Sequence, residues 1–472
     1  MACTKNRSRI WVSSATLGFF GVLLLQVSEL WGAFASQFSL SVGEEYSDNI
    51  FFSKEKESDF VTLIVPRFSF YHAPVGETVP TLSLNIAPKG QIYARHSEIN
   101  NFGDDFSING GYTFHYSPRL TFNFSQDFKR QGDARLTGLT DTGNQLPLTP
   151  TAPFPPGSTI PNLPAQSLRD YTPAGHQLSN NFAFQGNYRY RPNISISSGY
   201  TNSYAKFLTR GGSDLTQTFS VRGIYNWKNE HNLHAGYSLS IVNPRNGDDG
   251  VIHDFDFGDD YFTSQVYKVQ ITPTLNLAAS TGISINTSGN GPSIANNTTL
   301  IITKLWEKAF LSGGVRKGLT PTFGISGVSD TTDLFANFSV QLAERLNATA
   351  TSNFAFYDTD QVNFRTFQTS AGIHYLINSW LSSGLYYSYR SIYGGSGATN
   401  TGLLEKGTVS ASNVFLSVTA RFDIWPNTGL SRSEPFSGGA PVLRTPFPLT
   451  SATPAAPFKQ PAVPPRPLPI RD

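Results

Sequence analysis

The sequence predicts an all-β fold, a transmembrane antiparallel up-and-down β-barrel of about 16 to 18 strands, and three observations carry this prediction. Apolar and polar residues alternate in strand-length segments from Phe38 to Trp425. Many of these segments run to about ten to fourteen residues, the length that a tilted strand needs to cross a bilayer. The links after every second segment are mostly short. A soluble sandwich has shorter strands and no reason to sort its links in this way.

Alternation with period two is clearest in the segments 120–127, 334–342 and 414–424. Side chains at every second position share one face of a strand. One face of these strands is apolar and the other is polar, as in a wall between lipid and a water-filled interior. We therefore expect the following apolar side chains to face lipid: Leu334, Phe338, Val340, Leu416, Val418 and Phe422.

The strand boundaries follow from the alternation and from the turn residues between segments. Proline suits these turns because it presets φ and cannot donate to a strand ladder. An even number of strands is expected for a bacterial barrel. The segments expected as strands are 37–44, 59–71, 82–95, 104–116, 119–130, 180–191, 193–206, 215–228, 232–243, 262–273, 275–287, 297–307, 309–317, 331–344, 346–357, 363–377, 380–392 and 409–425.

Composition supports a barrel and excludes other classes. Of the 472 residues, 14% are charged and 13% are aromatic, and the net charge is +2. The mean hydropathy of −0.22 is too low for a bundle of transmembrane helices, but it suits strands with one polar face. No cluster of Lys and Arg indicates nucleic-acid binding. We expect no nucleic-acid partner and no cofactor.

Residues 1–35 have the pattern of a secretory signal peptide. A basic start with Lys5, Arg7 and Arg9 precedes an apolar stretch at 17–27, and Ala33 to Ala35 offers a cleavage site. The apolar stretch is shorter than the roughly 20 residues that span a bilayer as a helix, so an uncleaved anchor is the less favoured alternative. Export points to the outer membrane of a Gram-negative bacterium, with residues 36–425 as the barrel.

Two proline-rich segments fall outside the expected wall. Residues 131–179 follow the fifth strand and are expected to form a long extracellular loop, which either folds inward to narrow a pore or stays solvated at the surface. Residues 426–472 are expected to form a periplasmic tail. Such a tail either docks a periplasmic partner or is a disordered appendage.

Candidate chemical sites are few. Asp254, Asp256 and Asp260 stand in a stretch rich in aspartate that we expect to be an outer loop. Their oxygen-rich spacing is a weak indication of calcium, because Gln265 stands where a calcium loop needs an acidic residue. A solvated acidic loop is the alternative. No set of nucleophile, base and acid is evident, so we do not expect an enzyme.

Basic side chains recur on the expected polar faces. Rings of such side chains tune a water-filled pore toward anions, although cation and acid pairs across neighbouring strands would explain them equally well. The residues expected to line the pore are Arg189, Arg222, Arg316, Arg345 and Arg421.

Two stretches resemble a known family. Gly43 to Phe52 (GEEYSDNIFF), followed by 59–70, is similar to the opening of the β-barrel porin family that includes PEP-CTERM-system-associated outer-membrane proteins. Gly318 to Gly324 (GLTPTFG), followed by 330–333, resembles a later hairpin of that family. The resemblance implies an outer-membrane barrel, sometimes encoded beside exopolysaccharide or protein-sorting systems, and it implies no catalytic residues. The proline-rich tail departs from the family pattern.

These observations predict a porin-like passive channel for small hydrophilic solutes. The first alternative is an outer-membrane component or anchor of exopolysaccharide export, and the second is an outer-membrane enzyme. The expected partners are outer-membrane lipid and lipopolysaccharide, the barrel-insertion machinery, and a periplasmic partner for the tail.

Overall fold

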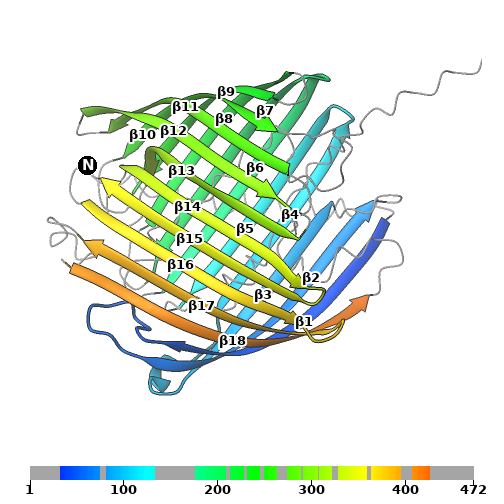
Figure 1. Ribbon diagram of the computed structural model, residues 1–472, viewed down its shortest axis with the longest axis vertical. Helices are drawn as coiled ribbons and strands as arrows, with labels where there is room; N and C mark the ends of the chain where they lie inside the picture. The colour runs from blue at the N-terminus through cyan, green and yellow to red at the C-terminus, as the bar shows by residue number, and fades with distance from the viewer. Residues whose placement is uncertain are drawn as a thin grey trace, which may run out of the picture.

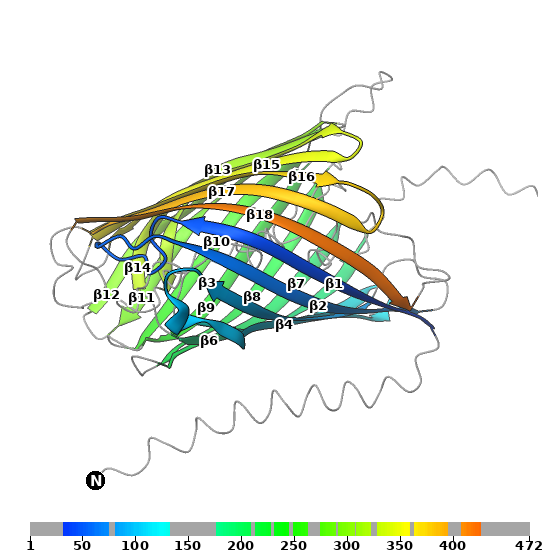
Figure 2. The same cartoon turned by 90° about the horizontal axis from the view of Figure 1, so that it is seen from below.

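The computed structural model is one closed β-barrel of eighteen strands (Figure 1). Consecutive strands pair antiparallel, and β1 pairs with both β2 and β18, so the last strand closes the ring on the first. Figure 2 shows β1 between β18 and β2. This confirms the expected fold class at the upper end of the expected strand count. The structure describes residues 32–74, 81–132, 176–208, 213–227, 231–244, 249–262, 274–288, 291–306, 308–321, 328–358, 363–394 and 407–425.

The strands have between 12 and 19 residues, enough to cross a bilayer when tilted. One short 3-10 helix, η2 (Ser97–Ile99), lies between β3 and β4. The strands are β1 (Gly32–Ser47), β2 (Asp59–Pro74), β3 (Leu82–Tyr93), β4 (Asn101–Ser117), β5 (Leu120–Gln131), β6 (Gln177–Arg191), β7 (Ile194–Phe207), β8 (Ser213–Trp227), β9 (His231–Asn243), β10 (Gly250–Phe262), β11 (Thr274–Ser288), β12 (Gly291–Leu305), β13 (Ala309–Pro321), β14 (Val328–Ala343), β15 (Leu346–Asp358), β16 (Asn363–Leu376), β17 (Leu381–Gly394) and β18 (Gly407–Trp425).

The two faces of the wall are those that the alternation predicts. Leu416 and Val418 are 55% and 45% exposed on the outer face of β18, whereas Ser417 between them is 5% exposed and faces inward. The register carries the outer face from strand to strand: Val418 lies opposite Val42 of β1 and Ser383 of β17. Leu334, Phe338, Val340 and Phe422 share this outer face. The prediction for all six lipid-facing residues is confirmed.

The tenth strand is the one that sequence analysis misplaced. It was expected at 262–273, but β10 spans Gly250–Phe262, and residues 263–273 lie outside the described part of the chain. Phe255 and Phe257 are exposed on the outer face. Asp254, Asp256 and Asp260 occupy the inner phase, whereas Asp259 shares the outer phase of the two phenylalanines. The acidic stretch is therefore a wall strand and not an outer loop, because alternation with period two outweighs the low strand propensity of aspartate.

The links differ between the two ends of the barrel. We call the end where β1 begins and β18 ends the terminal end. Two-residue turns join strands there, at 118–119, 192–193 and 344–345. We call the opposite end the loop end. The links 48–58 and 395–406 at that end are longer. The expected sorting has exceptions: 75–81 and 263–273 at the terminal end are long, and 289–290 at the loop end is short.

Some expectations fall on residues that the structure does not describe. Gln131 and Gln177–Ser179 belong to β5 and β6, so the expected loop 131–179 is shorter than predicted, and 133–175 lie outside the described residues. The expected tail 426–472 and residues 1–31 also lie outside the described residues. Strand β1 begins at Gly32, so cleavage after Ala35 would leave Ser36 as its first residue. The described residues include no helix long and apolar enough to cross a membrane.

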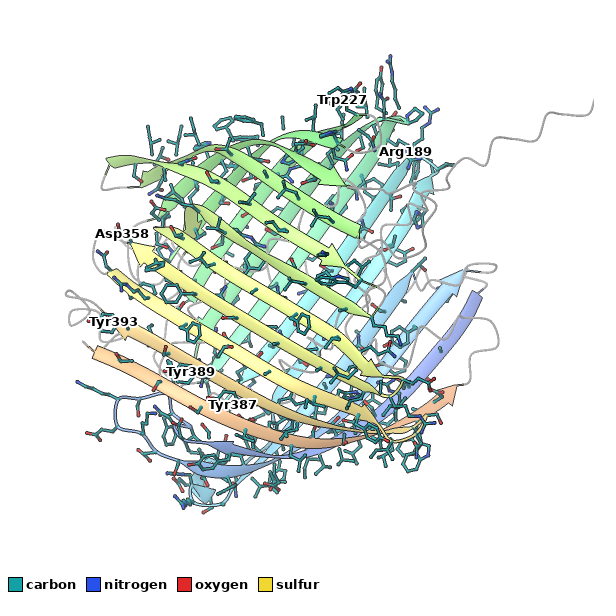
Figure 3. All side chains as sticks on the ribbon, viewed as in Figure 1. Arg189, Trp227, Asp358, Tyr387, Tyr389 and Tyr393 are labelled. Atoms are coloured by element: carbon teal, nitrogen blue, oxygen red, sulfur yellow. The ribbon has the colours of Figure 1, made fainter. Side chains whose placement is uncertain are left out.

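Large aromatic side chains mark the terminal end of the outer face. Figure 3 places Arg189 and Trp227 toward this end and Asp358 and Tyr393 toward the loop end. Aromatic side chains gather where a membrane protein meets the bilayer interface. Together with the apolar outer face, this girdle makes the chain an outer-membrane β-barrel. Its exposed members are Tyr116, Tyr190, Trp227, Trp306 and Trp380.

Candidate functional site

The link between β1 and β2, residues 48–58, packs against the inner face of the barrel at the loop end. Its apolar side chains Ile50 and Phe52 are 0% and 2% exposed, although connecting segments usually run over the surface. Burial of such side chains stabilises by about 1.5 to 3 kcal/mol each. Ile50 packs against inward-facing side chains of β2, β3 and β18, namely Val61, Leu63, Val65, Ala87, Tyr93 and Phe415.

Phe52 packs on the side of β1 that leads to β18, β17, β16 and β15. The guanidinium carbon of Arg390 lies 4.5 Å from the centroid of its ring, within the range of a cation–π contact. Phe52 has a φ of 49°, a left-handed conformation that costs a residue with a side chain roughly 1 to 2 kcal/mol. The ring also packs against inner side chains of β15 to β18, which are Ala355, Tyr357, Phe364, Ile392 and Ala411.

Hydrogen bonds fix the backbone of this link. The Nδ2 of Asn49 donates to the carbonyls of Ser53 and Ser410, at 2.6 and 2.9 Å, and its Oδ1 accepts from the amide of Ser53 at 3.0 Å. The amide of Asp48 donates to the carbonyl of Ser412 at 3.1 Å. Asn49 thus ties the link both to itself and to β18, which holds the strained Phe52 in place.

The packed link is a constriction of the lumen. The strands that Ile50 and Phe52 contact, together with β1 itself, are β15, β16, β17, β18, β1, β2 and β3, which follow one another in the ring. One folded link therefore lies against a continuous sector of the inner wall at the loop end. We call residues 48–58 the constriction loop.

A histidine joins the constriction loop to the next link at the same end. His96 places Nε2 3.0 Å from Glu57 Oε2 and Nδ1 2.8 Å from Asp59 Oδ2. Its ring also meets Phe51 edge-on, with centroids 5.5 Å apart. The hydrogen bond to Asp59, and then that to Glu57, raises the pKa of His96, because both favour the imidazolium.

The contacts of His96 with Glu57 and Asp59 predict that the constriction loop loosens as pH rises. Because the pKa of His96 is raised, its contribution is complete below its unfolded pKa of about 6.5 and is lost as pH rises through the folded pKa. Hydrogen exchange of amides 48–58 should become faster, relative to intrinsic rates, as pH rises above about 6.5. His96→Gln should remove this pH dependence. An equal pH dependence in that variant would assign the effect to another group.

A charged network lies on the inner face of β8, β9 and β10. Nη2 of Arg222 lies 2.7 Å from Asp256 Oδ2, and His234 Nε2 is 3.6 Å from the same oxygen. Arg222 and Asp256 are both register partners of Gly236 on β9. A Cβ at Gly236 would overlap the Asp256 carboxylate, so glycine there gives the ion pair room to form across the strand.

The calcium candidates belong to this network, not to a calcium loop. Asp254 accepts from Ser284 and, at 3.3 Å, from Ser238, while Asp256 pairs with Arg222. Asp260 shares the inner face of β10 with them. In the part of the chain that the structure describes, no group of three His, Cys, Asp or Glu side chains is placed to hold a metal ion.

Basic side chains gather on the opposite sector of the wall. Arg67 of β2 and Arg421 of β18 are both register partners of Ser39 on β1, and Arg390 lies on β17 beside Phe52. In the ring of eighteen strands, β10 stands diametrically opposite β1. The lumen is acidic along β8 to β10, where the inner aspartates outnumber Arg222, whereas along β17 to β2 the inner acids Glu45, Asp59 and Asp423 offset the three arginines.

The structure places the five expected pore-lining arginines in different surroundings. Arg222 is in the ion pair with Asp256, and Arg316 faces inward with its guanidinium carbon 4.7 Å from the centroid of the Phe335 ring. Arg189 and Arg421 are also on inner faces. Arg345 is not in the wall: it lies in the turn between β14 and β15 and donates to the carbonyl of Ile377 at 3.3 Å.

Sequence reasoning missed the constriction loop. It treated residues 45–58 as a link between two strands and gave no role to Ile50 and Phe52. The available signal was three successive apolar residues, Ile50 to Phe52, inside an otherwise polar link. A solvated link has no need of such a run, so it indicates burial, although it does not say against which strands.

Comparisons with known proteins add the following. No family model and no curated protein matches the sequence. Among solved structures, the barrel is similar to Pseudomonas aeruginosa OccK2 (OpdF), with 8% identity, a TM-score of 0.44 and coverage of 83% of this chain and 98% of that chain. Acinetobacter baumannii OccAB3 has 10% identity, a TM-score of 0.40 and coverage of 82% and 99%. At these values the likeness carries no argument about function, which depends on the lumen itself.

Proposed function

We propose that this protein is a porin-like passive channel for small hydrophilic solutes, narrowed at the loop end by the constriction loop. The observation that carries the proposal is a closed wall with an apolar outer face and a polar inner face. Such a wall surrounds an aqueous passage in barrels of this size. Inner residues such as Thr201 and Ser220 are exposed in the middle of β7 and β8, which supports water in the lumen.

The distribution of charge supports weak ion selectivity. Inner acids such as Asp214, Asp254 and Asp260 offset the inner arginines, and Arg222 is already paired. An overall positive potential, which the arginines alone would suggest, therefore has little support. The surplus of acids along β8 to β10 gives that sector of the lumen a negative potential, and the resulting field orients a dipolar solute during passage.

Planar-bilayer recording with purified protein tests both statements. We expect discrete conductance steps and a reversal potential close to zero under a KCl gradient. Asp256→Asn removes an acid and leaves Arg222 without its counter-charge, so the reversal potential should shift toward anion preference. Arg222→Ala should shift it toward cations. Asp330→Asn, on the outer face beside Lys317, is the matched control and should change nothing.

Two outcomes would contradict the proposal. Identical reversal potentials in Asp256→Asn and Arg222→Ala would mean that ions do not pass this network. The absence of conductance in every variant, including those that loosen the constriction loop, would favour the alternative of an export component or anchor. Such a role would agree with the narrower resemblance to PEP-CTERM-associated barrels.

A further inference from the structure

The outer face of β5 to β8 departs from the apolar pattern near the loop end. Register places Gln126, Phe182, Asn202 and Gln217 in one row across these strands. The Nε2 of Gln126 donates to Asn180 Oδ1, and both Asn202 and Gln217 donate to the Tyr200 hydroxyl at 3.3 Å. We call Gln126, Asn180, Asn202 and Gln217 the amide patch. Asn202 is only 8% exposed, so the cost of facing hydrocarbon falls on the other three amides.

Two cationic side chains lie between the amide patch and the loop end. Arg130 of β5 and Lys206 of β7 are both register partners of Leu178 on β6, so their backbones are two strand spacings apart, about 10 Å. Arg130 contacts Asp104 at 3.4 Å through Nη2, and its Nε is buried without a hydrogen-bond partner among the described residues. Lys206 is exposed.

Aromatic side chains lie below the amide patch, toward the middle of the wall. Phe124 and Phe184 are 4.9 Å apart between ring centroids, and Tyr200 and Phe219 are 4.8 Å apart. These four rings form the next row of the same four strands. From the loop end inward, one outer surface therefore offers cations, then amide groups, then aromatic rings.

We propose that this surface binds a phosphorylated glycolipid of the outer leaflet, of the lipid A type. Arg130 and Lys206 would contact a phosphate, the amide patch would hydrogen-bond to sugar hydroxyls and amide-linked groups, and the aromatic row would pack against acyl chains. The order of the three layers matches the order of groups in such a lipid.

Charge favours the lipid over a second copy of the chain. A symmetric dimer through this surface would bring Arg130 and Lys206 of one protomer toward the same cations of the other, and like charges oppose such contact. Lys317, an outward cation on β13 at the same end of the barrel, lies 3.7 Å from Asp330. Lys317, like Arg130, pairs with one aspartate, but it lies on a strand away from the amide patch, so it serves as an internal control.

The test measures binding of diphosphorylated lipid A to the purified full chain in detergent by native mass spectrometry. The double variant Arg130→Ala/Lys206→Ala should bind roughly tenfold more weakly or worse, because it loses two charge-assisted contacts. Lys317→Ala should bind like the parent chain. The same glycolipid without its phosphates should lose affinity for the parent chain to a similar extent. A difference in gel migration between unheated and heated protein would verify that each variant is folded.

Three results would overturn the proposal. Equal affinity of the double variant and the parent chain would remove the cations from the site. Displacement of lipid A by inorganic phosphate at a concentration similar to that of the lipid would mean a free phosphate site. Loss of a dimer mass in the double variant, without any change in lipid binding, would identify a second copy as the occupant.

Discussion

Phe52→Gly is expected to open the channel: single-channel conductance should rise and become noisier. Removing a buried phenylalanine side chain costs about 3 to 5 kcal/mol of packing. Relief of the left-handed φ of 49° at this residue returns about 1 to 2 kcal/mol. The closed arrangement of the constriction loop should therefore lose roughly 1 to 4 kcal/mol, and each 1.4 kcal/mol changes the closed-to-open ratio tenfold.

Lys56→Gln provides the matched control in the same loop. Lys56 pairs with Asp48 at 2.8 Å, and its side chain is 47% exposed, so its loss should cost at most about 1 kcal/mol. Conductance in this variant should stay near that of the parent chain. If Phe52→Gly conducts like the parent chain although hydrogen exchange shows a loosened loop, the narrowest point of the lumen lies elsewhere.

Val418→Arg is expected to destabilise the barrel by roughly 2 to 4 kcal/mol in phospholipid vesicles. Val418 lies on the outer face within an apolar run from Val414 to Ile424, and an arginine at the bilayer midplane of a barrel costs about that much. The cost falls toward the interfaces, where the side chain can snorkel. Urea titration of folding into vesicles measures the change directly.

Two controls separate charge from packing at this position. Val418→Leu keeps an apolar side chain and should cost less than about 1.5 kcal/mol. Thr419→Arg places the same charge on the neighbouring inner face and loses the 2.8 Å hydrogen bond to Ser41, a loss of about 1 kcal/mol. A larger cost for Thr419→Arg than for Val418→Arg would indicate that the wall does not sit in lipid as its faces suggest.

The wall was predictable because it is specified locally. In β14 and β18 every second residue is apolar, and a one-residue slip would turn every side chain to the wrong face. β10 was harder, since four of its thirteen residues are aspartate, and aspartate usually marks loops. The register of β9 and β11 around it, which accommodates three of these acids in the lumen, is not visible in the sequence of β10 itself.

The candidate site was less predictable, because it depends on contacts between distant segments. The alternation places Arg222 on an inner face, but only the register across β9 reveals that Asp256 is its partner over Gly236. Arg345 looked like a wall residue because it adjoins a long strand, yet it occupies a turn. The run Ile50 to Phe52 indicated burial without indicating the strands that receive it.

The closure of the ring has a consequence for the order of assembly. Every other strand pairing joins neighbours in the chain and forms from local contacts, whereas the β1 and β18 pairing brings together residues such as Gln37 and Asp423, which are 386 positions apart. Contacts of such sequence separation are formed late, because closing a long loop reduces the conformational entropy of the chain. The constriction loop is hydrogen-bonded to Ser410 and Ser412 of β18, so the narrow part of the channel is completed only after the final strand is in place.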